Sequence, residues 1–240
     1  MNLVVDIGNT FVKLAVFEGD RLVELLLEEN LNNELLLQIH TQYSIKKAMY
    51  SSVRNSEGDE KLLKKYNFYQ LGPETPIPLV LKYKTPATLG LDRIAVTVGA
   101  NHTFANENVL AIDMGTCVTF DFVNAKNEYL GGAIAPGFEM RFKALAKFTG
   151  KLPLINFEKH KVSEIGKTTE ESIVSGVYWG MKHEIEGTIN SYLAQYESLK
   201  IMVTGGDRNL FDLEPKNRIF ADQFLVLKGL NEILKYNEKE

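Results

Sequence analysis

The chain of 240 residues has a single cysteine, and this scarcity removes several classes of protein at once. Cys117 has no second cysteine with which to form an internal disulfide, and one cysteine does not make a cysteine-based zinc site. No apolar run approaches the roughly 20 residues that a helix needs to span a bilayer. The N-terminus lacks the basic segment of a signal peptide, and Asp6 interrupts its apolar stretch. We therefore expect a cytoplasmic protein without a membrane partner.

The chain also has no excess of positive charge. It carries 27 Lys and Arg against 31 Asp and Glu, for a net charge of −4, and contains no run of five basic residues. Proteins that bind nucleic acid usually present a basic patch or stripe, so we expect no nucleic-acid partner. The hydrophobic content of 45% is ordinary for a globular protein. At about 150 residues per domain, the length allows one or two domains.

The most informative feature that the sequence does contain is a short phrase that occurs twice. Val5-Asp6-Ile7-Gly8-Asn9-Thr10 stands near the start, and Ile112-Asp113-Met114-Gly115-Thr116-Cys117 stands near the middle. Each phrase follows an apolar, strand-like run and precedes another. Glycine lets the backbone approach an anion, and successive N–H groups can point at it. A carboxylate there can hold Mg²⁺ together with phosphates.

One Asp-x-Gly phrase alone is also an ordinary hairpin turn, and Lys13 alone is also an ordinary solvated strand lysine. Two copies, each placed between apolar strands, favour a phosphate-binding role over an ordinary turn. They predict two similar halves, residues 1–107 and 108–240, around one nucleotide.

Apolar periodicity predicts an α/β protein in which both halves run strand–strand–strand–helix–strand–helix. The expected strands are 2–7, 11–17, 21–27, 45–53, 68–71, 79–83, 108–113, 117–123, 128–134 and 199–203. The expected helices are 31–43, 57–66, 93–104, 138–148 and 169–196. In the last of these, apolar residues recur every four positions from Ile173 to Leu193, which fits an internal core better than an interface between copies. Thr168 and Glu171 resemble a capping box at its start.

The segment Gly90 to Arg93 allows two interpretations. In the structural one, Asp92 is a helix N-cap and Arg93 a solvated surface residue. In the functional one, Asp92 takes a proton from an attacking hydroxyl, and Arg93 clamps a carboxylate with two parallel hydrogen bonds. Spacing alone leaves both open.

Three further features are equally ambiguous. Gly131 to Gly137 is either a strand-to-helix corner or a place where backbone meets a ligand. Thr204-Gly205-Gly206 is either a strand-end turn or a loop beneath a nucleotide. Tyr83 is either a pocket wall or an ordinary strand aromatic.

Taken together, these residues resemble the motifs of type III pantothenate kinases, members of the acetate and sugar kinase/Hsp70/actin superfamily. The matching positions are Asp6 to Lys13, Tyr83, Gly90 to Arg93, Asp113 with Gly115, Thr116, Thr119 and Asp121, Gly131 to Gly137, Thr169, and Thr204 to Gly206. Two positions depart from the family pattern. Cys117 replaces an alanine, and Thr168 replaces an asparagine beside the threonine that binds substrate.

The resemblance implies two ribonuclease H-like, actin-like ATPase halves, each a mixed sheet flanked by helices, with the active site in the cleft between them. It also implies ATP-dependent phosphorylation of pantothenate to 4′-phosphopantothenate, the first step of coenzyme A synthesis, with Asp92 as general base. The family is homodimeric, with pantothenate bound at the subunit interface.

The resemblance further assigns ligands to residues. The ATP-binding residues that it implies are Asp6, Ile7, Gly8, Asn9, Thr10, Phe11, Val12, Lys13 and Thr116. The pantothenate-binding residues that it implies are Tyr83, Gly90, Leu91, Asp92, Arg93 and Thr169. Mg²⁺ accompanies ATP near Asp6, and Asp113 binds a monovalent cation, K⁺ or NH₄⁺. Few Lys or Arg side chains stand in the phosphate motifs, which fits neutralisation by metal ions.

Two other functions stay open at this point. One is another kinase of the same superfamily, acting on a sugar or acetate, which would have no use for a carboxylate clamp at Arg93. The other is a non-catalytic nucleotide-dependent switch, which would keep both Asp-x-Gly hairpins and have no need of Asp92.

Overall fold

The computed structural model describes residues 1–8, 11–54, 56–158 and 162–238, apart from the side chain of Asn217. The chain forms two compact units. Unit 1 comprises Met1–Asn106, Lys126–Leu130 and Phe224–Glu240, and unit 2 comprises Glu107–Ala125 and Gly131–Gln223. None of the described helices combines the length and the apolar character needed to cross a membrane.

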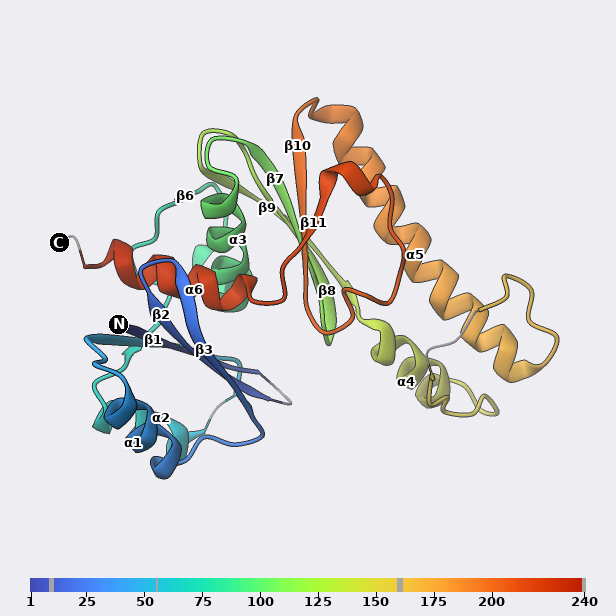
Figure 1. The fold of residues 1–240 in the computed structure, drawn as a ribbon. Helices are drawn as coiled ribbons and strands as arrows, with labels where there is room; N and C mark the ends of the chain where they lie inside the picture. The colour runs from blue at the N-terminus through green and yellow to red at the C-terminus, as the bar shows by residue number, and fades with distance from the viewer. Residues whose placement is uncertain (9–10, 55, 159–161, 239–240) are drawn as a thin grey trace. The chain divides into compact units, whose positions relative to one another are not determined.

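Unit 1 is built on a five-stranded mixed sheet in the order β3-β2-β1-β4-β5 (Figure 1). Its strands are β1 Asn2–Ile7, β2 Val12–Glu18, β3 Arg21–Glu28, β4 Lys47–Ser52 and β5 Tyr69–Gln70. β1 runs antiparallel to β2 and parallel to β4. Its helices are α1 Asn33–Gln42, α2 Glu57–Lys65, α3 Leu91–Thr103 and α6 Leu225–Tyr236.

The two faces of this sheet are covered by different helices. Leu3, Val5 and Ile7 of β1 share a core with Leu36 of α1 and Leu63 of α2. On the other face, α6 packs against β1, β2 and β4, and α3 packs on α6. Because side chains alternate along a strand, Asp6 belongs to the face opposite Val5 and Ile7.

Unit 2 repeats this arrangement. Its strands are β7 Asn108–Met114, β8 Cys117–Val123, β9 Glu128–Pro136, β10 Leu199–Thr204 and β11 Ile219–Ala221. They lie in the order β9-β8-β7-β10-β11. β7 runs antiparallel to β8 and parallel to β10, as β1 does to β2 and β4. The short β6, Val80–Leu81, pairs with the first residues of β9. The predicted duplication and the α/β class with two mixed sheets are confirmed.

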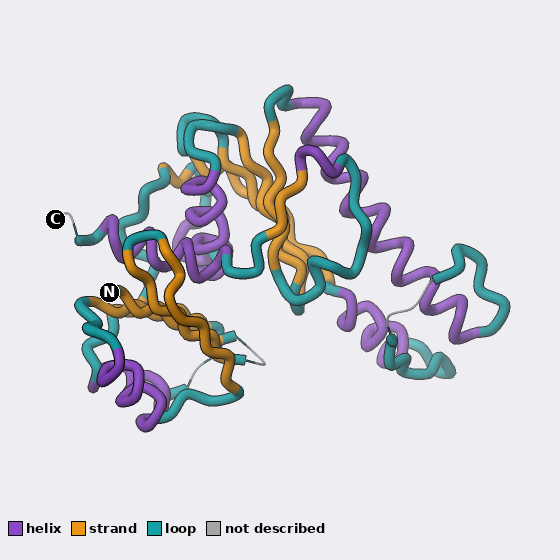
Figure 2. The backbone as a smooth tube through the Cα atoms, in the orientation of Figure 1, coloured by secondary structure: helices purple, strands orange, loops and turns teal. Residues whose placement is uncertain are grey.

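The expected order strand–strand–strand–helix–strand–helix is wrong in the second half, where two helices, α4 Phe138–Phe148 and α5 Thr169–Gln195, both precede β10. The predicted ranges 138–148, 169–196 and 199–203 already placed both helices before that strand, and all three elements are present. α5 is 27 residues long and runs beside the strands of unit 2 (Figure 2). The strand order is nevertheless the same in both units.

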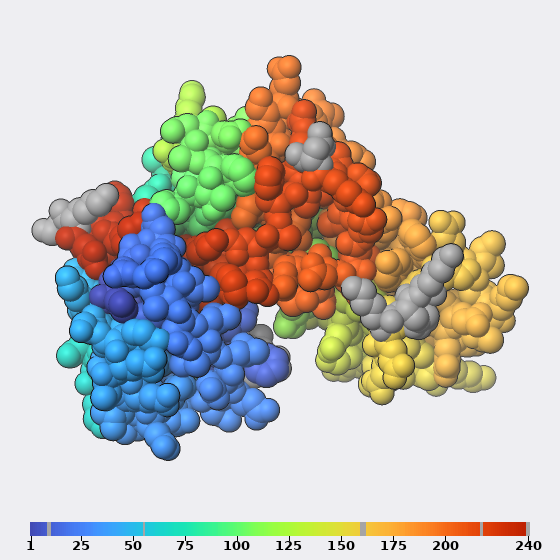
Figure 3. All heavy atoms as spheres, viewed as in Figure 1, coloured from blue at the N-terminus to red at the C-terminus, as the bar shows by residue number. Residues whose placement is uncertain are grey.

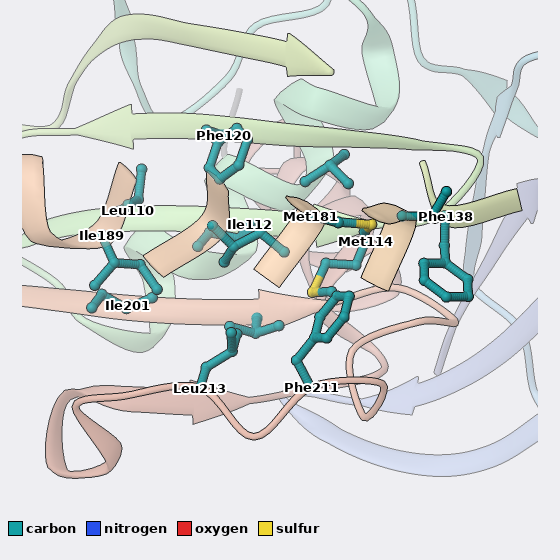
Figure 4. Packing of buried hydrophobic residues seen from close by; sticks show 14 of the residues in the cluster. Leu110, Ile112, Met114, Phe120, Phe138, Met181, Ile189, Ile201, Phe211 and Leu213 are labelled. Atoms are coloured by element: carbon teal, nitrogen blue, oxygen red, sulfur yellow. The ribbon is translucent and has the colours of Figure 1, made fainter. Parts of the chain in front are cut away.

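The apolar stripe of α5 is core, as its spacing suggested. Ile173, Val177, Met181, Ile185 and Ile189 are all buried, in one cluster with side chains from β7, β8 and β10 (Figure 4). Thr168 caps the helix, as expected, but the capping box is incomplete. The N–H of Glu171 donates to Oγ1 of Thr168 at 3.1 Å, whereas the Glu171 carboxylate accepts, at 2.6 Å, the N–H of Lys167, the residue before the N-cap.

Two elements near the end of the chain, β11 and α6, were not predicted from the apolar periodicity. α6 buries Leu225, Leu227, Leu230, Ile233 and Leu234. By its contacts α6 groups with unit 1, although it follows the strands of unit 2 in the chain. A division of the chain at residue 107 would separate α6 from the unit with which it packs. The domain boundary at residue 107 therefore stays a prediction.

α3 and α6 approach each other at two glycines. A Cβ on Gly229 would lie 1.8 Å from the carbonyl oxygen of Ala95, and a Cβ on Gly99 would lie 2.5 Å from that of Leu225. The backbones are therefore in contact, and no side chain fits between them. Since the first turn of α3 carries Asp92 and Arg93, this packing fixes the helix that presents them.

We predict that Gly229→Ala destabilises the protein by about 1–3 kcal/mol, because the added methyl overlaps backbone atoms that have no free rotamer. Helix propensity alone predicts the opposite, a gain of up to about 1 kcal/mol. Gly187→Ala is the matched control, because Gly187 lies inside α5 with no atom near its ideal Cβ. Urea unfolding of both variants decides between the two effects, and a stabilised Gly229→Ala would contradict the close packing.

Candidate active site

The turn between β1 and β2 is the first predicted phosphate site. The N–H of Gly8 donates to the carbonyl of Phe11 at 3.0 Å and closes the turn. Ile7 and Val12 are fully buried, so any contact that they make with a ligand uses their backbone. Phe11 is 43% exposed. The predicted ATP residues Asn9 and Thr10 lie outside the described residues.

Asp6 and Lys13 form an ion pair across this hairpin. They are directly opposite in the β1–β2 ladder, and Nζ of Lys13 lies 4.0 Å from Oδ2 of Asp6. Burial raises the pKa of the Asp6 carboxyl from 3.8 to about 6. The Lys13 ammonium lowers this pKa, and the carboxylate of Asp92 raises it further. The pair therefore offsets only part of the cost of burying the charge.

Arg54 also contributes to this turn, and sequence reasoning missed it. It follows β4, and its Nε donates a short hydrogen bond to the carbonyl oxygen of Gly8. Its buried Nη2 has no hydrogen-bond partner among the described residues. A basic residue just past the strand that pairs with β1 was the signal that could have found it.

Asp92 lies in the first turn of α3, not at its N-cap. The N-cap is Gly90, and Oδ1 of Asp92 accepts the N–H of Arg93 at 2.8 Å. A Cβ on Gly90 would lie 2.5 Å from that oxygen, so glycine makes room for the carboxylate. Arg93 is only 6% exposed. The structural interpretation of this segment, an N-cap aspartate followed by a solvated arginine, is therefore wrong.

The proximity of Asp6 and Asp92 is the main feature of the site in unit 1. The two come from motifs far apart in the sequence, yet they are close enough for the charge of one to raise the pKa of the other. Two neighbouring carboxylates disfavour each other's ionised form unless a cation relieves them. This donor set fits Mg²⁺, which prefers one or two carboxylates combined with phosphate oxygens.

The other substrate residues predicted in unit 1 lie on or near this helix. Tyr83 is half-buried, with its ring centroid 5.9 Å from that of the buried Tyr129. Leu91 is half-buried as the first residue of α3. The ring of Tyr83 is therefore partly exposed and packs against the buried ring of Tyr129.

The second Asp-x-Gly turn lies in unit 2, between β7 and β8. The N–H of Gly115 donates to the carbonyl of Cys117 at 2.9 Å, and Thr116 is exposed. The N–H of Gly137 donates to the carbonyl of Thr116 at 3.1 Å. A Cβ on Gly137 would lie 2.2 Å from the carbonyl oxygen of Gly115. The last glycine of the Gly131 to Gly137 motif therefore packs directly on the turn.

The Thr204-Gly205-Gly206 segment packs against the end of β7. Gly205 has φ +92°, and a Cβ there would lie 2.5 Å from Oδ1 of Asp113 and 2.2 Å from the carbonyl oxygen of Met114. Only glycine fits, both for its backbone conformation and for its space. The segment therefore holds its backbone against Asp113.

Thr169 borders a groove in unit 2 with a volume of about 960 Å³. Thr168, Thr169 and Lys167 line it at the start of α5, and Arg141 lines it from α4. The Arg141 guanidinium donates to the carbonyl of Pro136 at 2.9 Å and to Glu184 at 2.8 Å. Thr169 is exposed, whereas the Thr168 hydroxyl caps the helix. Of the two threonines, Thr169 has the hydroxyl left for a ligand.

A five-stranded sheet built twice, with an Asp-x-Gly hairpin in each copy, defines the class of kinases and ATPases with the actin-like fold. Solved structures with the same fold match nearly the whole chain. One described as a Baf family transcriptional activator from Campylobacter jejuni matches with a TM-score of 0.62 at 24% identity, over 99% of this chain and 100% of that one. A ROK family glucokinase from Streptomyces griseus matches with a TM-score of 0.54 at 11% identity, over 100% and 99%.

The sequence narrows the class to one family. The pattern of type III pantothenate kinases matches residues 2–191. A type III pantothenate kinase from Phocaeicola vulgatus is 45% identical over 242 residues, which cover 100% of both chains. The chain therefore belongs to the type III pantothenate kinase family, which confirms the resemblance.

We predict that Asp6→Asn stabilises the protein at high pH only. The pKa of the Asp6 carboxyl is about 6 in the folded protein and 3.8 in the unfolded chain. Its burial therefore costs little below pH 4, the cost grows between pH 4 and pH 6, and it stays constant at higher pH. Relative to the parent protein, the variant should gain on the order of 1–3 kcal/mol at pH 8 and little at pH 4. Urea unfolding at both pH values measures this difference.

Lys13→Met is the matched control for that prediction. It removes the cation that offsets the Asp6 charge, so it should lower stability at pH 8 and change it little at pH 4. Equal effects of Asp6→Asn at the two pH values would contradict the raised pKa.

Proposed function

We propose that the protein transfers the γ-phosphoryl group of ATP to the primary hydroxyl of pantothenate, which gives 4′-phosphopantothenate, the first intermediate of coenzyme A synthesis. Membership of the type III pantothenate kinase family supports this substrate pair. The single observation that carries the chemistry is the proximity of Asp6, in the phosphate hairpin, to Asp92, in the substrate motif.

In this proposal Asp92 is the general base. Phosphoryl transfer needs an oriented acceptor hydroxyl and a group that accepts its proton. The N–H of Arg93 holds one carboxylate oxygen of Asp92 at 2.8 Å, which leaves the other oxygen for the hydroxyl of pantothenate. The first turn of α3 thus gives the base a fixed orientation, and positioning is most of what this reaction asks of a protein.

The pantothenate carboxylate is assigned to Arg93. Its burial suits it to an ion pair that water screens little, and a guanidinium matches the two oxygens of a carboxylate. Tyr83, Gly90 and Leu91 would line the same site, and Thr169 would add a hydroxyl from the start of α5.

The ATP phosphates are assigned to the turn after Asp6, with Lys13 and Arg54 as the nearby cations and Thr116 as a donor from the second hairpin. The Mg²⁺ that accompanies ATP would be held through its phosphates beside Asp6, where it would neutralise negative charge. Asp113 would hold a monovalent cation, K⁺ or NH₄⁺.

We also propose a homodimer, on the strength of three exposed apolar side chains in one part of unit 2, named here the apolar patch of unit 2. Phe148 is 80% exposed, Ile165 is 75% exposed and Leu154 is 56% exposed. They belong to the end of α4 and to the segment between α4 and α5, which is mostly yellow in Figure 3. Large apolar side chains that are exposed in the single chain are candidates for burial between two copies.

Asp92→Asn should lower kcat at least about 10²-fold, the usual scale for loss of a general base. The amide keeps the size of the side chain and the oxygen that accepts the N–H of Arg93, so the start of α3 should persist. ATP and pantothenate binding, measured by calorimetry, is the control and should change little. Near-normal turnover in a coupled assay with K⁺ would show that Asp92 is not the base.

Ile165→Glu should convert the dimer to monomers, because it places a charge in the apolar patch of unit 2. Leu27→Glu is the matched control, since Leu27 is 56% exposed on β3 of unit 1, outside the patch. Light scattering on each variant gives the mass in solution. A dimeric Ile165→Glu or a monomeric Leu27→Glu would place the interface elsewhere.

A further inference from the structure

The two Asp-x-Gly aspartates have neighbours at equivalent positions of their sheets. Asp6 on β1 is in register with Lys13 on β2 and with Ser51 on β4. Asp113 on β7 is in register with Thr119 on β8 and with Thr204 on β10. Each aspartate thus has one neighbour on an antiparallel strand and one hydroxyl neighbour on a parallel strand.

In both units the three neighbours share one face of the sheet, because in-register residues place their Cβ atoms on the same side, about 5 Å apart. In unit 2, Ile112 and Met114 of β7 and Val118 and Phe120 of β8 enter the core beneath α5. Asp113 and Thr119 alternate with them and therefore lie together on the opposite face.

The charges at these equivalent positions differ. In unit 1 the antiparallel neighbour of the aspartate is the cation Lys13, 4.0 Å away. In unit 2 the same position holds the neutral Thr119. Asp121, fully buried two residues further along β8, lies on the same face and adds a second carboxylate. The position that holds Lys13 in the first hairpin thus holds a neutral threonine in the second.

Thr119 also has an unused hydroxyl. Its Oγ1 is buried, and among the described residues it has no hydrogen-bond partner. A hydroxyl oxygen has two lone pairs to offer, and an unsatisfied buried polar atom is costly. Hard cations take carboxylate, hydroxyl and carbonyl oxygens as ligands. Gly205 packs its backbone against Asp113 and the carbonyl of Met114, so no side chain from position 205 covers the Asp113 carboxylate.

We propose that Thr119 is a ligand of the monovalent cation at Asp113, and that this cation gives the second hairpin the positive charge that Lys13 gives the first. The inference rests on the proposed function for the assignment of a cation to Asp113. The new elements are a second ligand, Thr119, and a reason for the cation. In the first hairpin the positive charge belongs to a side chain of the protein, Lys13, and in the second it comes from a cation bound from solution.

Thermal unfolding in K⁺ tests the ligand without relying on turnover. KCl is titrated against N-methylglucamine chloride at constant ionic strength, and the melting temperature of the parent protein should rise with K⁺ to a plateau. Thr119→Val keeps the shape and removes the hydroxyl, so the K⁺ concentration at half-effect should increase about fivefold or more. Ser51→Ala removes a hydroxyl that lies beside Asp6 in the first hairpin, on the parallel strand β4, and should leave that concentration unchanged.

Thr119→Lys tests the equivalence of the cation and the lysine. The variant should be as stable without K⁺ as with it, and its turnover should no longer depend on K⁺. Thr119→Met has a similar length and no charge, so K⁺ should not stabilise it, and at every K⁺ concentration its stability and turnover should stay at the low level of the parent protein without K⁺. If the lysine variant fails to fold, Thr119→Val still decides.

An unchanged K⁺ midpoint in Thr119→Val overturns the proposal, and so does an equal shift in Ser51→Ala. The two proposals fail separately. A chain that shows the expected K⁺ shifts but does not phosphorylate pantothenate supports this cation site and overturns the proposed function. If the protein phosphorylates pantothenate but Thr119→Val leaves the K⁺ midpoint unchanged, the proposed function is supported and this cation site is overturned.

Discussion

The architecture depends on a carboxylate placed at the end of a buried strand. Asp6 follows three apolar residues of β1 and sits 4.0 Å from Lys13, yet burial still raises its pKa to about 6. A protein stable without ligand would gain by replacing it with a neutral residue. A group that is costly in the free protein and favourable beside a cation is typical of a binding site.

The packing of unit 1 brings the second carboxylate to the first. α3 is held by backbone contact with α6 at Gly99 and Gly229, so its first turn has a fixed position. Gly90 then makes room for the Asp92 carboxylate, which the N–H of Arg93 orients. A helix from the last part of the chain thus positions the segment near residue 92, which we propose to be catalytic. The strand order around Asp6 is repeated around Asp113 in unit 2.

The local sequence predicted those elements that are set by contacts between neighbouring residues. The Thr168 cap, the buried stripe of α5 and both Asp-x-Gly hairpins follow from short spacings, and all are present. The predictions were wrong where contacts between distant residues decide. Asp92 looked like an N-cap, because an acid near a helix start usually is one, but Gly90 takes that position. Arg93 looked solvated and is buried, as is every residue of α3 from Arg93 to Asn101.

The sequence by itself determined the duplication, the family and the residue types of the site, because these are written in motifs of a few residues each. Only the tertiary structure decided which of these residues interact. Strand register places Ser51 beside Asp6 and Thr204 beside Asp113. Helix packing brings Asp92 to Asp6 and places the C-terminal α6 in unit 1. These contacts join residues that are far apart in the sequence, and the spacing of residues within a short motif does not indicate which distant residues will meet.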